Sequence, residues 1–580
     1  MTEGGDGGGG AGGDERDWAI WLRLLSHSVR DTAVSASTDD TAVLQAVRKL
    51  HELCKIEGSG DLVARVYPSL TKLFQRCCAS VVSSQRSSTG LLLLTILQFF
   101  LDFGEFVLHD GDPSLRTFFR SFLSRQYADP TVAAATIDFL NQNKTKLLLA
   151  HATLLPQYFP LLLKVVAWGS NSLDKPFLEL LPALMGPSSF LPLFPALLDL
   201  PALVLALEKL ESRSGSAPGA STVPNKKSPA PEALLALMDE AYTGSAIADV
   251  GAEPGDNGQP SARDEADALC SELLRDENEG LAERHWSYPG MAAALQSLMG
   301  SVQSQRLQHA LSLTPSLLSV YFAVALRDVN DSLMSALLPF VFARVDAMFP
   351  DPKFSLECRK ILLEFVLAAF HQSPHFIAVL KKPIMDRIGQ PYTSTAKTEL
   401  ALQLCWAVGE HGGGGFAHKA AARELFETLE LLLYENLSSR RMTTMKADLE
   451  QKDEGALIAV ASQSRLLCFV VTAIAKLATC HRELSPRARV CLAKVARSHQ
   501  VLDKSVWRRA RDYLGLMHEP AICSSVLGPS TGYLNRPGSV QWSQGGTKAV
   551  ASIPFYLLGG NEGAPFHNFS LSDVLGKTPT

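Results

Sequence analysis

Two stretches of the sequence carry residues whose types and spacing could hold magnesium and a nucleotide. Residues 264–267 read Asp-Glu-Ala-Asp, the box with which helicases bind magnesium. That chemistry needs a G-x-x-x-x-G-K-[ST] loop to cradle the phosphates, and the sequence has none. Residues 576–578 read Gly-Lys-Thr, but Leu571 stands where the first glycine belongs. We therefore expect Asp264 and Asp267 to be catalytically inert.

A second pattern resembles the nucleophile of a hydrolase. Residues 528–532 fit G-x-S-x-G with Ser530 as the nucleophile, and His411 precedes the glycines 412–415 as in an oxyanion loop. The G-x-S-x-G turn works only between a strand and a helix. Here a helical pattern precedes it and further proline and glycine follow. We interpret both stretches as loops and expect Ser530 to be inert.

Residues that could hold a metal or a cofactor do not form a site in the sequence. The 14 histidines show neither H-E-x-x-H nor zinc spacing, and the 10 cysteines contain no Cys-x-x-Cys pair. Reduced cysteines buried in a core are the simpler interpretation. The sequence thus predicts a protein without a cofactor that is not an enzyme.

A basic segment between residues 482 and 511 is the strongest surface feature. It holds nine Lys or Arg residues and two acidic ones. The pattern supports two interpretations, a solvated helix face with scattered ion pairs or a patch for anionic lipid headgroups or an acidic partner. The candidate residues lie on two successive predicted helices: Arg487, Arg489, Lys494, Arg497, Lys504, Arg508, Arg509 and Arg511.

Helical periodicity runs through most of the chain and sets the fold class. An N-cap side chain precedes a proline at several predicted helix starts. These pairs begin at Asp112, Asp129, Thr314, Asp351, Ser373 and Ser485. The spacing predicts about twenty amphipathic helices with short connections and no strands before residue 520. Helix pairs without a strict motif favour an all-α, HEAT or armadillo-like solenoid over tetratricopeptide or ankyrin repeats.

Shifts in composition divide the chain into five parts. Glycine dominates its beginning, and a Pro-, Gly- and Ser-rich stretch that becomes acidic interrupts the helical pattern. The predicted parts are a disordered N-terminus (1–16), an N-terminal solenoid (17–211), a flexible linker (212–263), a C-terminal solenoid (264–520) and an irregular tail (521–580).

Charge and hydropathy point to a cytoplasmic location. The net charge of −5 argues against bulk binding of nucleic acid, and the first residues show no secretory signal. The longest apolar run, Leu91 to Leu108, is interrupted by Gln98, Asp102 and Glu105, so we interpret it as a buried helix and not as a membrane span.

Three blocks of sequence, in order, are similar to one known family, the zeta large subunits of adaptor protein complex 5. The first block comprises residues 158–168 (YFPLLLKVVAW), 177–184 (FLELLPAL) and 196–201 (ALLDLP). The second comprises residues 405–410 (CWAVGE) and 425–435 (LFETLELLLYE), and the third residues 472–478 (TAIAKLA) and 485–488 (SPRA).

This resemblance implies a function without catalysis. It implies a scaffold subunit in endosomal and lysosomal vesicle transport, peripheral on late endosomes and lysosomes. The implied partners are the beta, mu and sigma subunits of the complex, together with spatacsin and spastizin, and no nucleic acid. Two alternatives stay open: a HEAT-repeat scaffold of nuclear or DNA-repair assemblies, and an importin-like carrier.

Overall fold

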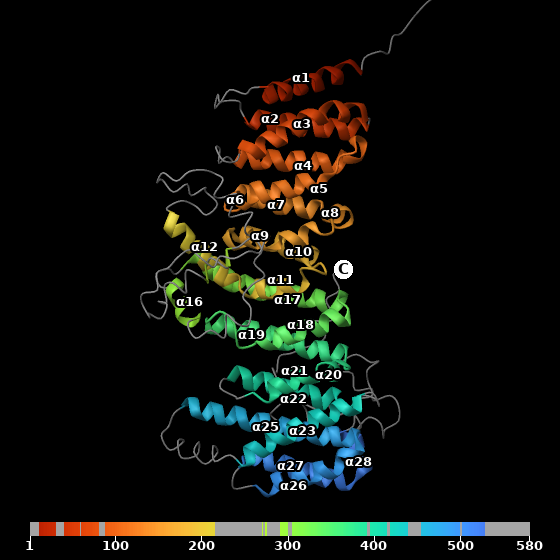
Figure 1. Cartoon of the computed structure of the whole chain (residues 1–580), viewed down its shortest axis with the longest axis vertical. Coiled ribbons are helices and arrows are strands. Elements are labelled where there is room, and N and C mark those ends of the chain that lie inside the picture. Colours follow the sequence, from red (N-terminus) through yellow and green to blue (C-terminus); the bar gives the residue numbers. More distant parts are fainter. Residues whose placement is uncertain are drawn as a thin grey trace, which may run out of the picture. The chain divides into compact units, whose positions relative to one another are not determined.

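The computed structural model describes most of the chain, and its secondary structure is helical throughout the described part (Figure 1). The described residues are 11–30, 40–58, 60–80, 87–214, 269–270, 273–274, 291–299, 304–390, 395–413, 418–438, 454–498 and 502–527. No strand occurs within these ranges. The predicted all-α solenoid architecture is confirmed.

The helices fall into two compact units. The first comprises residues 1–280 and 288–310, and the second comprises residues 281–287 and 311–580. In each unit, successive helices pack side by side in layers (Figure 1). The helices of the two units are given separately.

The first unit begins with four helices of 18–21 residues, and most of the helices that follow are shorter. Its helices are α1 (Ala11–Arg30), α2 (Asp40–Glu57), α3 (Gly60–Ser80), α4 (Ser87–Val107), α5 (Gly111–Thr117), the π-helix η1 (Phe118–Leu123), α6 (Ser124–Gln126), α7 (Pro130–Gln142), α8 (Lys144–Ala150), α9 (Leu154–Trp168), the 3₁₀ turn η2 (Asn171–Leu173), α10 (Asp174–Leu184), α11 (Phe190–Leu198), α12 (Leu200–Ser214) and α16 (Met291–Met299).

Helices of the second unit are longer on average. They are α17 (Gln305–Asp328, whose residues up to Ala310 group with the first unit), α18 (Asp331–Arg344), α19 (Pro352–Gln372), α20 (Phe376–Val379), α21 (Lys381–Ile388), α22 (Thr395–His411), α23 (Lys419–Ser438), α25 (Glu454–Cys480), the 3₁₀ turn η5 (Arg482–Leu484), α26 (Ser485–Arg497), α27 (Lys504–His518) and α28 (Pro520–Leu527).

Three helices are long and apolar enough to cross a membrane by length and composition: Ser87–Val107, Gln305–Asp328 and Gln463–Cys480. A bent pair, Phe190–Leu198 with Leu200–Glu211, also passes that test. More than half of each single helix's apolar window is buried inside the protein. The first of them, α4, packs against α2, α3 and α7, so the apolar run that begins at Leu91 is a core helix, as its interrupting charges indicate.

Some of the helix starts predicted before prolines are confirmed, and others are wrong. Asp129 and Asp351 cap α7 and α19, because their carboxylates accept hydrogen bonds from the first free backbone amides. Thr314 is a wrong start, since α17 begins at Gln305 and continues through Pro315. Ser304 caps α17 instead; its hydroxyl accepts from two amides of the first turn at 3.1 and 3.2 Å.

Three helices extend into segments that the sequence analysis expects to be irregular. α12 ends at Ser214, so residues 212–214 of the predicted linker are helical. α1 begins at Ala11, so residues 11–16 are helical; two acidic residues near its start favour a helix N-terminus. Residues 521–527 belong to α28, in which Cys523 and Leu527 are buried four residues apart, on one face. Residues 1–10, 215–263 and 528–580 of the predicted terminus, linker and tail lie outside the described part.

Candidate functional site

The eight predicted basic residues come together on two adjoining helices of the second unit. Residues 487–497 of the set lie on α26 and residues 504–511 on α27, and these two helices pack against each other. Seven of the eight side chains are exposed and Arg509 is half-buried. We call this set the basic surface.

The two helices are held by the apolar faces that the spacing predicts. On α26 the buried residues Ala488, Cys491 and Val495 recur at intervals of three and four. On α27 Val506 and Tyr513 are buried in the same manner, and the Tyr513 hydroxyl lies 2.9 Å from that of Thr472 on α25. The basic side chains therefore occupy the remaining faces.

Arg487 joins α26 to α23 and is a structural residue. Its guanidinium donates to Glu427 at 2.9 Å and to Glu430 at 2.6 Å, and it lies 5.5 Å from the ring centroid of Phe426. These hydrogen bonds raise the pKa of Arg487. Two carboxylates thus compensate its charge, which leaves little of it for a ligand.

Arg489 and Lys494 also make contacts within the unit. The Arg489 guanidinium donates to the carbonyl oxygen of Met517 in the last turn of α27 at 2.7 Å. The Lys494 ammonium lies 4.3 Å from the ring centroid of Tyr434 on α23, a cation–π distance. Some of the charges of the segment therefore stabilise the fold.

The outer part of the basic surface consists of four exposed residues. These are Arg497, Lys504, Arg508 and Arg511. Arg508 lies 5.7 Å from the ring of Trp507, which is half-buried beside it. These four side chains are exposed on the faces of α26 and α27 that the apolar residues leave open.

A buried ion pair at the centre of the second unit has no counterpart in the sequence analysis. Lys476 of α25 is 3% exposed, and its ammonium donates to the Glu410 carboxylate of α22 at 2.5 Å. α25 also packs against α23, α26, α27 and α28. The lone lysine in an otherwise apolar run of α25 is the sequence signal that could have revealed this pair.

His411 and Gly412, expected in a loop, end α22 in the core. Neither ring nitrogen of His411 has a hydrogen-bond partner within the described residues. Burial lowers the pKa of His411 to about 3, and the neighbouring His371 and Lys476 act in the same direction. A Cβ at Gly412 would lie 2.4 Å from the Val408 carbonyl oxygen, so only glycine fits. The arrangement is that of a packed helix end and not of an open oxyanion loop.

Asp102 connects helices of the first unit, as the Lys476–Glu410 pair does in the second. Its carboxylate pairs with His51 at 2.9 Å, Lys55 at 3.0 Å and Lys146 at 2.5 Å, and these residues come from α2 and α8. Burial alone would raise the pKa of Asp102, but the hydrogen bonds from these groups and from Gln98 outweigh it and hold the pKa far below its usual range. Asp102 thus ties three helices together.

The other chemical motifs receive no structural support. Asp264, Asp267 and Ser530 lie outside the described part of the chain. Across the described residues, no group of three or more His, Cys, Asp or Glu side chains could hold a metal ion. Eight of the ten cysteines are buried and the other two are half-buried, all as free thiols.

Two family models match the chain. One is described as an AP-5 complex subunit of vesicle trafficking (SPG48) and matches residues 38–164. The other is described as the C-terminal TPR repeats of AP-5 complex subunit zeta-1 and matches residues 262–544. That description assigns TPR repeats where the sequence analysis favours HEAT or armadillo-like pairs; both are stacked helix pairs.

Two curated relatives carry the same name. The AP-5 complex subunit zeta-1 of Homo sapiens is 26% identical over 510 residues, which are 84% of this chain and 57% of the relative. That of Mus musculus is 25% identical over 525 residues, 88% of this chain and 58% of the relative. The chain therefore spans a little over half of the length of these relatives. No solved structure matches the chain.

Proposed function

Because the chain belongs to the family of AP-5 complex zeta-1 subunits, we propose that it is a non-catalytic scaffold subunit of an adaptor complex in endosomal and lysosomal vesicle transport. The observation that carries the proposal is the pair of family matches, which cover residues 38–164 and 262–544 without overlap.

The helical architecture suits a scaffold. Stacked helix pairs offer long surfaces on which several partners can bind side by side, because each repeat contacts only its neighbours. Both units are built from such layers. The partners that fit the family are the beta, mu and sigma subunits of the AP-5 complex, with spatacsin and spastizin as associated proteins.

The basic surface gives the scaffold a means of approaching a membrane. Each Lys or Arg close to an anionic bilayer contributes about 1 kcal/mol, and the effect fades beyond a Debye length of ~8 Å at physiological salt. The exposed residues Arg497, Lys504, Arg508 and Arg511 can thus assist recruitment to anionic lipid without being sufficient for it.

The place of the protein in the cell tests this function. We expect a tagged full-length chain to overlap with markers of late endosomes and lysosomes and to leave the membrane fraction on a salt wash, as a peripheral protein does. Accumulation in the nucleus would contradict the proposal and favour a nuclear or DNA-repair scaffold. Shuttling through nuclear pores with a bound cargo would favour a carrier of the importin kind.

A further inference from the structure

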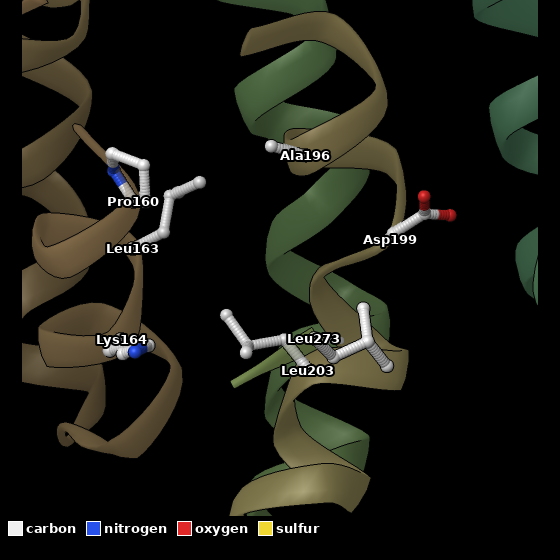
Figure 2. A pocket seen from close by; sticks show the side chains of 7 residues that line it. All are labelled: Pro160, Leu163, Lys164, Ala196, Asp199, Leu203 and Leu273. Atoms are coloured by element: carbon white, nitrogen blue, oxygen red, sulfur yellow. The ribbon is translucent and has the colours of Figure 1, made fainter. Parts of the chain in front are cut away.

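His411 is buried in the second unit without the hydrogen bonds that the two buried lysines of the protein make. Lys164 of the first unit, labelled in Figure 2, is 5% exposed and donates to the carbonyl oxygen of Leu274 at 2.5 Å. Lys476 donates to the Glu410 carboxylate at the same distance. His411 is 4% exposed, and neither of its ring nitrogens has a hydrogen-bond partner within the described residues. A charged ring would be far more costly to bury in this way than a neutral one, so the buried imidazole is neutral.

The surroundings of this imidazole leave it no path to water within the packed unit. The rings of Trp406 and of His371 on α19 stand edge-on to it, with centroids at 5.9 and 6.0 Å. A Cβ at the next residue, Gly412, would lie 2.8 Å from the side chain of Leu477 on α25. Beyond α25, the Nε2 of His481 donates to the Gly412 carbonyl oxygen at 3.1 Å. The ring of His411 therefore reaches water when the end of α22 moves away from the end of α25.

The charged groups around the ring oppose a proton on it. Burial lowers the pKa of His411 to about 3, and His371 and Lys476 act in the same direction. The acid beside it, Glu410, already accepts from Lys476. Of the other elements packed against α22, α20 carries no titratable group, and the nearest titratable groups along the chain on the rest are Lys381 and Lys382 at the start of α21 and Cys480 at the end of α25. None of these groups supplies a hydrogen bond to the ring.

Protons thus distinguish the packed form of this helix end from the released form. In the packed form the ring stays neutral down to about pH 3, whereas in water it binds a proton with the ordinary pKa of 6.5. Acid therefore stabilises the released form and leaves the packed form unchanged as the pH falls below 6.5. At the lower end of that range, each pH unit raises the released population about ten-fold.

We propose that residues 411–413 form a pH-operated latch, which is packed against the end of α25 while His411 is neutral and is released when the ring binds a proton. His411 is the last residue of α22, so the latch opens without unwinding the preceding turns of the helix. The inference is independent of the proposed trafficking function, because it rests on the burial and contacts of His411.

Hydrogen exchange of the Gly412 amide in the unmodified full-length chain tests the proposal. This amide donates to the Val408 carbonyl oxygen at 2.9 Å, a bond that opens with the latch. Its exchange rate, divided by the intrinsic rate at each pH, reports the released population. We expect that population to rise about ten-fold from about pH 7.5 to about pH 5.5, with a limiting slope of one proton for each opening.

Two reference regions show that the opening is local. The amides of α7 in the first unit, a helix without histidine, should change less than about two-fold over the same range. The amide of Val495, buried on α26 of the second unit, should have a released population at least about ten-fold below that of Gly412 at every pH.

Three variants assign the proton to one ring. His411→Leu keeps an apolar side chain in the site but binds no proton, so the exchange of Gly412 should vary less than about two-fold with pH. His518→Leu makes the same change at an exposed histidine of α27 and should keep the about ten-fold rise. His371→Gln removes the neighbouring ring and should keep it as well.

The proposal is overturned if the exchange of Gly412 in the unmodified chain does not rise with acid, if its slope requires two protons, or if Val495 opens as often as Gly412. It is equally overturned if the rise persists in a folded His411→Leu chain or disappears in His371→Gln. Because the first three outcomes concern the unmodified chain, a variant that fails to fold does not affect them.

Discussion

Each unit buries one lysine within an apolar helix, and the two lysines are stabilised differently. Lys164 in the first unit and Lys476 in the second are 5% and 3% exposed, and each ammonium lies 2.5 Å from an oxygen. For Lys476 that oxygen belongs to the Glu410 carboxylate on an adjoining helix. For Lys164 it is the backbone carbonyl oxygen of Leu274.

The difference lies in what each contact loses when its lysine is removed. A buried carboxylate and a buried ammonium must stay together, since removing either leaves an uncompensated charge. A backbone carbonyl is less demanding, because it carries no net charge and water can satisfy it. The second unit therefore carries its charge pair as part of its core, whereas the first unit buries an ammonium against a backbone carbonyl.

Breaking the pair in the second unit should have the largest effect. Lys476→Met leaves the Glu410 carboxylate, 13% exposed, without its ammonium partner, and we expect a loss of about 3–5 kcal/mol of stability. Thermal unfolding and hydrogen exchange of α22 and α25 in the full-length chain measure it. Adding Glu410→Gln should restore more than half of the loss; an equal loss in the double variant would mean that packing, and not charge, is responsible.

Acid should weaken the same region through His411. Its pKa is about 3 in the folded protein against 6.5 for the free side chain, so the unfolded state binds more protons. Stability is therefore complete above pH 6.5 and falls as the pH drops from 6.5 toward 3, by about 2 kcal/mol at pH 5. His411→Leu should flatten the dependence of unfolding on pH in this window. An unchanged slope would contradict the burial of a neutral imidazole.

Removing the lysine of the first unit should cost less. Lys164→Met removes the charged hydrogen bond to the carbonyl of Leu274, a half-buried residue that water can reach, so we expect a loss of about 1.5–3 kcal/mol. Thermal unfolding of the full-length chain compares it with Lys476→Met. A loss as large as that of Lys476→Met would remove the distinction between the two lysines.

The exposed charges should affect binding and not stability. Arg497→Glu, Lys504→Glu, Arg508→Glu and Arg511→Glu together should weaken co-sedimentation with vesicles that contain phosphatidylserine by at least about ten-fold, because several contributions of ~1 kcal/mol are lost. Rising salt should weaken binding of the unmodified chain. The apolar face with Val506 and Tyr513 is intact, so the melting temperature should hold.

A control with the same change in charge is available on scattered helices. Arg48→Glu, Lys72→Glu, Lys353→Glu and Lys382→Glu alter exposed residues away from α26 and α27 and should leave vesicle binding within about two-fold of the unmodified chain. Equal losses in both variants would show that net charge alone matters. Lost binding to an acidic peptide, with vesicle binding intact, would assign the basic surface to a protein partner.

Local rules account for what the sequence predicts of this fold. Helical spacing and the caps at Asp129 and Asp351 are contacts between residues a few positions apart, so the all-α architecture and many helix starts follow from them. The start predicted at Thr314 is wrong because the helix already begins after Ser304, whose hydroxyl caps it. α17 continues through Pro315, and the sequence pattern alone does not show that it does so.

Contacts between distant residues account for what the sequence does not predict. Lys476 and Glu410 are 66 positions apart and Lys164 and Leu274 are 110 apart, so no spacing rule joins them. A lone lysine in each apolar run shows that an acceptor is needed but not which one. The basic surface was predicted as a group, yet the part that Arg487 plays in holding α23 emerges only from the packed helices.

Purification of the tagged full-length chain under mild conditions, followed by quantitative mass spectrometry, tests the central claim most directly. The account predicts that the beta, mu and sigma subunits of the AP-5 complex are enriched together, in amounts comparable to the chain, and that Arg497→Glu with Arg511→Glu leaves this enrichment intact. Enrichment of nuclear or DNA-repair assemblies, or recovery of a well-folded chain without any adaptor subunit, would contradict it.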